Sequence, residues 1–141
     1  MKFADDEHRL FYETTVQKAN AANDWYRQAL FYTLGILPDT RRHINDIYDF
    51  KERIIRTDAI KEEWQTSGSM RVTRMAFNLY NGFMGHDGNL EIDDPSKYSP
   101  YQLFDVSNAE YFFEAVLILN GVYRRCEPIS LDDVRSYRLS C

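Results

Sequence analysis

The chain lacks most of the features that identify the common classes of small protein. It has only two cysteines, Cys126 and Cys141, too few for the disulfide framework of a small secreted domain and without zinc-site spacing. No apolar run approaches the roughly 20 residues that cross a bilayer, and the acidic N-terminus is unlike a signal peptide. These absences predict a cytoplasmic protein that does not enter the membrane and whose two thiols are free.

Motifs with a fixed chemistry are missing as well. The sequence has no H-x-x-x-H, H-E-x-x-H or paired-cysteine spacing, and the acids from Asp87 onward lack the glycine and terminal glutamate positions of an EF-hand. We therefore predict no metal site and no cofactor. Whether the protein is an enzyme stays open at this point.

Aromatic side chains, by contrast, are abundant. They make up 15% of the 141 residues and include ten tyrosines, whereas the hydrophobic (44%) and charged (28%) fractions are ordinary for a globular protein. Tyrosine hydroxyls need polar partners, so the surplus indicates a semi-buried core or an interaction surface. A chain of this length buries one core, and we predict a single domain over residues 1–141.

Capping residues and apolar periodicity predict a mainly α fold, a compact bundle of about seven helices. Asp5 and Asp24 are expected helix caps, Ser67 or Ser69 caps a long helix, and Ser107 opens a capping box. Residues 82–99 are predicted to form one long irregular loop, with 89–93 as the clearest strand candidate. The predicted helices are 5–21, 22–35, 37–50, 57–65, 67–82, 99–104, 107–121 and 130–139.

The segment "LPDTRRHINDIYDF", residues 37–50, contains the candidate catalytic residue. On a helical wheel Ile44, Ile47 and Tyr48 face the core, and the acids lie mainly on the solvent side with Arg42. His43 could act as a general base held by Asp39 or Asp46, although a solvated salt-bridge face is the simpler interpretation. Arg41 lies on the apolar margin, where its guanidinium needs a carboxylate, a carbonyl or an external anion.

A second segment, "WQTSGSMRVTRMAFNLYNG", predicts a helix with a broad apolar face and a narrow polar strip. The strip carries only planar hydrogen-bonding groups, and hydroxyls lie at the helix N-terminus, where free N–H groups attract anions. A capping loop with a buried polar seam is the alternative interpretation. The predicted anion-binding residues are Arg41, Arg71, Arg74, Asn78, Asn81, Ser67 and Ser69.

The charge of the chain is concentrated toward its C-terminus. The net charge is -5, and residues 87–141 carry ten acidic and five basic side chains. This balance disfavours nucleic-acid binding through overall charge, leaves a local arginine patch open, and favours a basic protein partner. The predicted partner-binding residues are Asp87, Glu91, Asp93, Asp94, Asp132 and Asp133.

Three stretches, "ALFYTLGILPDTRRHINDIYDF", "WQTSGSMRVTRMAFNLYNG" and "YSPYQLFDVSNAEYFFEAV", together resemble a family of small uncharacterised bacterial proteins, a domain of unknown function. The resemblance covers the chain from about Ala29 to Val116 and brings no catalytic residue with it. It implies a setting on phages and conjugative elements, where small acidic proteins often inhibit host defence.

These observations lead to three hypotheses about function. The first is a protein that binds and inhibits a host defence effector, such as a nucleic-acid-bound CRISPR nuclease or a restriction system, through its acidic surface. The second is an enzyme or receptor for a phosphate-bearing ligand, a nucleotide or RNA, held by the arginines. The third is a helical scaffold or oligomerisation module.

Overall fold

The computed structural model describes residues 1–125. Helix α1 (Asp6–Lys18) and helix α2 (Trp25–Leu34) begin where the sequence predicts, because the carboxylates of Asp5 and Asp24 accept hydrogen bonds from first-turn N–H groups. On α1 the buried face consists of His8, Tyr12, Thr15 and Val16.

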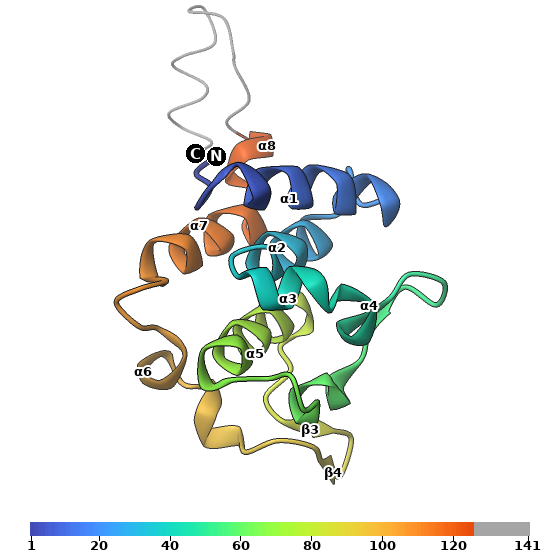
Figure 1. Ribbon diagram of the computed structural model, residues 1–141, viewed down its shortest axis with the longest axis vertical. Coiled ribbons are helices and arrows are strands. Elements are labelled where there is room, and N and C mark those ends of the chain that lie inside the picture. Colours follow the sequence, from blue (N-terminus) through green and yellow to red (C-terminus); the bar gives the residue numbers. More distant parts are fainter. Residues whose placement is uncertain (126–141) are drawn as a thin grey trace, which may run out of the picture.

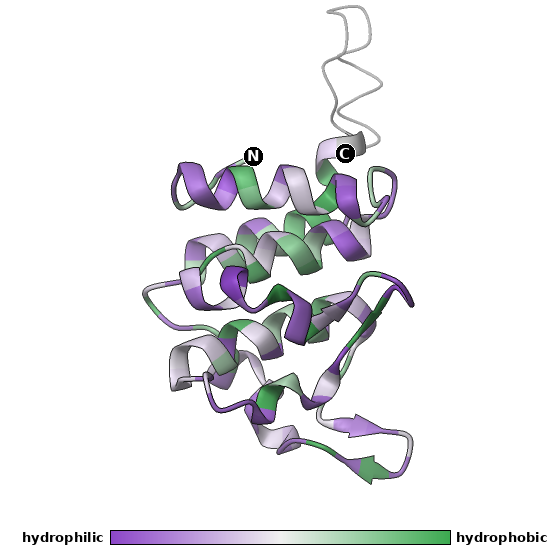
Figure 2. Cartoon of the chain, turned by 45° about the vertical axis from the view of Figure 1, so that its right-hand side comes forward, coloured by the Kyte–Doolittle hydropathy of each residue, from purple (hydrophilic) through white to green (hydrophobic). Residues whose placement is uncertain are grey.

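Helix α2 is the centre of the molecule. It packs against α1, α5 (Ser67–Asn81) and α7 (Ala109–Leu119), and its residues 28–34 are all buried. Figure 1 shows α1 at one end and α5 on the far side of α2, with the hairpin labelled β3 and β4 beyond α5 and another hairpin beside α4. Hydrophobic residues concentrate in these inner helices in Figure 2, whereas the outer side of α1 is hydrophilic. The predicted mainly α fold is confirmed.

The single helix predicted over residues 37–50 is wrong. The chain instead forms α3 (Pro38–Arg42), a break at His43, and α4 (Ile44–Ile47), which leads into strand β1 (Tyr48–Asp49). Strand β1 pairs antiparallel with β2 (Ile54–Ile55). The end of the helical segment at Ile47 has a tertiary cause: Tyr48 is extended, 1% exposed, packs edge-on against Phe31, and accepts a hydrogen bond from Arg27.

The segment 82–99 is more regular than the predicted loop. Strand β3 (His86–Asp87) pairs antiparallel with β4 (Leu90–Glu91), and the 3₁₀ helix η2 (Pro95–Tyr98) follows. Gly88 has a φ of 61° in the turn between the strands, which permits so short a hairpin. The strand candidate at 89–93 is confirmed at Leu90–Glu91.

The remaining elements complete the bundle. A 3₁₀ helix, η1 (Thr57–Lys61), precedes α5, and α6 (Pro100–Leu103), α7 and α8 (Val122–Arg125) follow the second hairpin. Ser99 caps α6 as predicted, but α5 is capped by Thr66, and α7 starts after Asn108 without a side-chain cap. The predicted capping box at Ser107 is therefore absent: the N-cap is Asn108, one residue later, and the Glu110 carboxylate accepts a hydrogen bond from Lys2.

Several predicted features lie outside the described residues: the helix over 130–139, both cysteines, and the acids Asp132 and Asp133. Within residues 1–125, no helix has the length and apolar character needed to cross a membrane.

Candidate partner-binding groove

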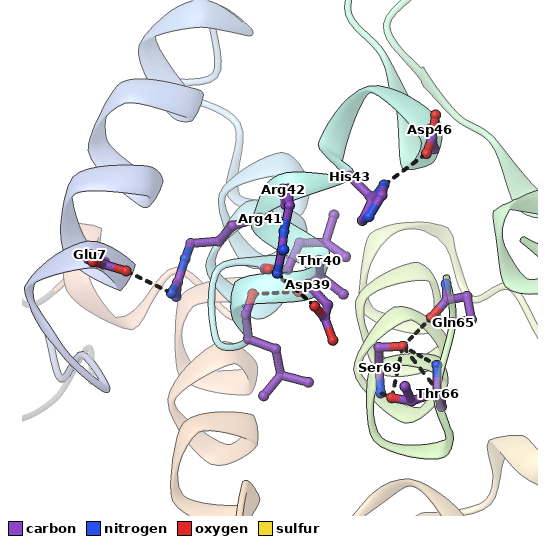
Figure 3. A network of polar contacts seen from close by, with 12 residues as sticks. Glu7, Asp39, Thr40, Arg41, Arg42, His43, Asp46, Gln65, Thr66 and Ser69 are labelled. Carbon is purple, nitrogen blue, oxygen red and sulfur yellow. Dashed lines mark hydrogen bonds and ion pairs between the residues drawn. The ribbon is translucent and has the colours of Figure 1, made fainter. Parts of the chain in front are cut away.

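Arg41, which the sequence places on an apolar margin, has its charge satisfied inside the protein. Its Nη1 donates to the Gly35 carbonyl at 2.6 Å, and its Nη2 lies 3.2 Å from Glu7 Oε2 on α1. Figure 3 shows this side chain reaching across to α1, away from α5. At 11% exposure it serves as a tether between α3, the end of α2 and α1, with both guanidinium contacts supplied by the chain.

Arg71 and Arg74 on α5 are also neutralised by the chain itself. Arg74 donates from Nε and Nη2 to the two carboxylate oxygens of Asp93, at 2.7 and 3.1 Å. Arg71 pairs with Asp105 and also donates to the Gln102 carbonyl. The hydrogen bonds that Arg74 donates to Asp93 raise the pKa of Arg74 despite its burial, so the pair stays charged.

Three of the predicted anion-binding residues do come together. Ser67, Arg71 and Arg74 line a pocket of about 220 Å³, which Met70, Lys97 and Gln102 complete. Arg41 is not part of this lining. Asp93 and Asp105 offset the two arginines, and Lys97 makes no ion pair with another residue of 1–125, so the net positive charge offered to a ligand is small.

Ser69, Asn78 and Asn81 have local structural partners. Ser69 and Thr66 form a reciprocal capping box at the start of α5, and Ser69 Oγ also donates to Gln65 (Figure 3). Asn78 donates to the Phe83 carbonyl, and Asn81 accepts from the Phe83 N–H. These contacts match the capping loop and polar seam given above as the alternative interpretation.

His43 lies at the break between α3 and α4. Its Nδ1 is 3.2 Å from Asp46 Oδ2, the i,i+3 contact predicted, and its ring stacks on Trp64 at 4.2 Å and 4°. Arg42 pairs with Asp39 and not with Asp46 (Figure 3). A catalytic role for His43 stays a prediction.

The predicted acidic surface divides into structural and free carboxylates. Asp93 is held by Arg74 and by the Tyr98 hydroxyl, and Asp94 caps η2 through the Ser96 N–H. Burial opposes the charge of Asp93, but these hydrogen bonds outweigh it and lower the pKa of Asp93. Asp87 and Glu91, on the β3–β4 hairpin, are exposed and make no ion pair with any residue of 1–125.

An open groove of about 980 Å³ runs beside that hairpin. Its walls come from the start of α2, from β2, from the end of α5 and from β3, elements brought together only by the fold. Three of its apolar side chains are unusually exposed for their type: Tyr26 at 58%, Ile54 at 55% and Met84 at 55%. Tyr80 and Phe83 continue this apolar lining.

Arg27 lies in the groove wall, and its guanidinium donors are already engaged by other residues of the chain. Its Nη1 donates to Asp24 at 2.6 Å, its Nε to the Tyr48 hydroxyl, and its Nη2 to the Arg53 carbonyl, while its guanidinium stands 5.4 Å from the Tyr80 ring centroid. Burial works against the charge, but the bonds to Asp24 and Tyr48 outweigh it and raise the pKa of Arg27. This cation therefore braces the wall.

Two free carboxylates lie at the groove. Within residues 1–125, most acids without an ion pair or hydrogen bond lie on the two hairpins or on and just after η1; Asp6 on α1 is the exception. Of these, Asp87 lines the groove, and Glu91 pairs with the lining residue His86 across the β3–β4 hairpin. Asp58, Glu62 and Glu63 line a separate hollow with Lys61. We term Asp87 and Glu91 the rim carboxylates.

Comparison with known proteins places the chain in a family. The model of a family of unknown function, DUF6075, matches residues 1–130. The chain belongs to the DUF6075 family. No curated protein and no solved structure matches it. This membership agrees with the resemblance to an uncharacterised family and assigns no activity.

Sequence reasoning predicted Asp87 and Glu91 at this site and missed its apolar lining. Tyr26, Ile54 and Met84 come from three distant segments, and each stands next to another apolar residue (Trp25, Ile55 and Phe83), so no local pattern distinguishes it as an exposed side chain. The tyrosine surplus was the one signal of an interaction surface.

Proposed function

We propose that this DUF6075 protein acts by binding another protein, and that the groove between the hairpins is the binding surface. The supporting observation is the combination of exposed Tyr26, Ile54 and Met84 within one groove with a rim of unpaired carboxylates. Clustered exposed apolar side chains mark interaction sites more often than isolated ones do. An amphipathic ring such as that of Tyr26 is typical of interface anchors.

The chemistry of the groove points to a partner segment that joins apolar side chains with lysine or arginine. The apolar lining would bury the first, and Asp87 and Glu91 would attract the second. Phosphate-rich partners fit less well, because the donors of Arg27 are engaged by Asp24, Tyr48 and Arg53.

The finer proposal is that the partner is a host defence effector in the cytoplasm, a CRISPR nuclease or a restriction enzyme whose nucleic-acid groove is basic. It rests on the acidic rim and on the setting on mobile elements that the resemblance implies. An inhibitor of this kind acts stoichiometrically, so inhibition of a purified effector should reach completion near equal molar amounts. Inhibition at far lower ratios would indicate turnover and contradict this proposal.

Binding can be measured with a defined probe. A short fluorescent peptide of alternating lysine and leucine should bind the wild type in an anisotropy titration, and the matching glutamate–leucine peptide should not. Tyr26→Ser should weaken binding about 10-fold, because truncation of an anchor costs about 1–2 kcal/mol. Leu10→Ser is the matched control, since Leu10 is 62% exposed on α1, outside the groove.

Either of two results would contradict the groove proposal. One is equal binding of the basic and acidic peptides. The other is an equal loss of affinity in Tyr26→Ser and Leu10→Ser, which would place the peptide elsewhere.

A receptor for a phosphate group is the second candidate, and the pocket of Ser67, Arg71, Arg74 and Lys97 is the observation in its favour. If phosphate binds there, a titration with inorganic phosphate or a nucleotide should shift the NMR signals of Ser67 and Lys97, and Lys97→Ala should abolish the shift at Ser67. Unchanged signals at millimolar ligand would remove this candidate.

A further inference from the structure

A second exposed surface lies on α6, α7 and the turn between them. Val106 is 99% exposed, Tyr101 90%, Phe113 61% and Leu117 41%. With Phe104 and Ala109 they form what we term the α6–α7 face, which includes an apolar hollow of about 450 Å³. In Figure 1 α6 and α7 lie at the left, away from α4 and the hairpin after it.

Helix α7 is apolar on both of its sides. Its inner side buries Phe112, Ala115 and Ile118 in the core, which fixes the helix rigidly. Its outer side presents Ala109, Phe113 and Leu117, spaced four residues apart and so aligned in one stripe. Phe104 from α6 lies against Phe113, with ring centroids 5.1 Å apart, and widens the stripe. A contiguous exposed apolar face on a rigid helix is typical of a surface that another molecule covers.

The charged residues beside this face are already paired within the chain. Asp105 binds Arg71, Glu110 binds Lys2 at 2.5 Å, and Glu114 accepts hydrogen bonds from the Lys2 backbone and from Tyr123. Among the residues that the structure describes, the acids beside the face are therefore all paired, and they require no opposite charge on its cover.

The pairing of these charges indicates which kind of molecule can cover the α6–α7 face. In a two-fold symmetric contact a surface meets its own copy, so an unpaired charge near the axis would face its like. A face without free charges avoids that penalty. A lipid surface fits less well, because interfacial helices carry lysine and arginine along their polar side, and here the flanking side chains include Asp105, Glu110 and Glu114.

We infer that the α6–α7 face is a homodimer interface in which α7 packs against α7 of a second copy. Phe113 is the middle residue of the stripe, so an antiparallel crossing brings the two Phe113 rings together and sets Ala109 opposite Leu117. The carboxylates that lack an ion pair and the partner-binding groove lie outside this α7–α7 interface. The dimer thus displays two grooves, which increases avidity for a repeated or dimeric partner.

Sedimentation velocity of the full chain over a range of protein concentrations tests this inference. The wild type should convert from monomer to dimer as concentration rises. Val106→Glu and Phe113→Glu should each weaken dimerisation at least about 10-fold. Leu10→Glu places the same charge at an exposed leucine on α1 and should leave the dimer unchanged.

The design separates loss of the interface from loss of the fold. Val106 is almost wholly exposed, so Val106→Glu should keep the wild-type circular dichroism and melting temperature. Mixing Phe113→Glu with Phe113→Lys should restore a dimer, because the two-fold contact pairs position 113 with itself.

Three results would overturn the inference. They are a wild type that stays monomeric at the highest concentration, a dimer that persists in folded Val106→Glu and Phe113→Glu, and a failure of the charge-swapped mixture to dimerise. Binding of monomers to lipid vesicles through Phe113 would likewise replace the second copy with a membrane surface.

Discussion

Arg74 on α5 and Asp93, just after the β3–β4 hairpin, form a two-point ion pair that fastens the hairpin to the helical core. The bonds measure 2.7 and 3.1 Å, and the two side chains are only 15% and 10% exposed. Tyr98 donates a third hydrogen bond to the same carboxylate, at 2.7 Å. Because His86, Asp87 and Pro95 line the groove on either side of Asp93, this pair holds one groove wall in place.

Asp93→Asn should therefore destabilise the fold by about 2–4 kcal/mol, because it leaves the largely buried Arg74 without a counter-charge. Urea unfolding followed by circular dichroism measures the change. The exposed Arg9–Glu13 pair provides the control, and Glu13→Gln should cost about 0–0.5 kcal/mol. Equal losses in the two variants would show that the Arg74–Asp93 pair contributes no more than a surface pair.

Alanine substitutions at two glycines of the same hairpin distinguish the cost of backbone strain from the cost of a steric clash. Gly85 and Gly88 both have positive φ, 100° and 61°. A Cβ at Gly85 would stand 2.4 Å from the Asp93 carbonyl oxygen, whereas one at Gly88 would meet nothing within 4 Å. Gly88→Ala should cost about 1 kcal/mol in unfolding free energy, and Gly85→Ala roughly 2–4 kcal/mol.

Thermal unfolding of the two variants provides the comparison. A Gly85→Ala protein as stable as Gly88→Ala would mean that the Asp93 backbone does not lie against Gly85.

His8 should make stability fall in mild acid. Its ring is fully buried, with Nδ1 accepting from the Ala4 N–H at 3.0 Å and Nε2 donating to the Tyr32 carbonyl at 2.7 Å, so the neutral form fits the site. Burial lowers the pKa of His8, although the Tyr32 carbonyl opposes this, and Arg41 adds a smaller lowering.

The sign of the pH dependence follows from the lowered pKa. An unfolded histidine takes up a proton near pH 6.5, which the folded state resists, so stability is complete above that pH and is lost as pH falls below it. Free energies of unfolding measured between about pH 7.5 and pH 5 should show this slope. His8→Gln should flatten it, and His86→Gln, at an exposed position, should retain it. An unchanged slope in His8→Gln would contradict this role for His8.

Features set by local interactions were predictable from the sequence. The caps at Asp5, Asp24 and Ser99 and the apolar face of α5 depend on neighbours within a few residues. The end of the helical segment at Ile47 was not predictable, because the extended Tyr48 that follows it packs against Phe31, far away in the sequence.

The candidate site was predicted only in part for the same reason. Asp87 and Glu91 can be proposed from charge alone, but the partner of Arg74 lies 19 residues away and that of Arg71 34 residues away. No local pattern shows that these arginines are paired internally, and none brings Tyr26, Ile54 and Met84 together.

Charge reversal at the groove rim tests the central claim most directly. Asp87→Lys combined with Glu91→Lys removes two unpaired rim carboxylates, and Asp6→Lys combined with Glu13→Lys makes the same change in net charge on α1. The affinity of the lysine–leucine peptide is measured by anisotropy for both variants, from about 50 mM to about 300 mM salt. We predict at least about a 10-fold loss of affinity for the rim variant at low salt, with a shallower salt dependence, and little change for the α1 variant. Equal affinities of the two variants would contradict binding at the groove.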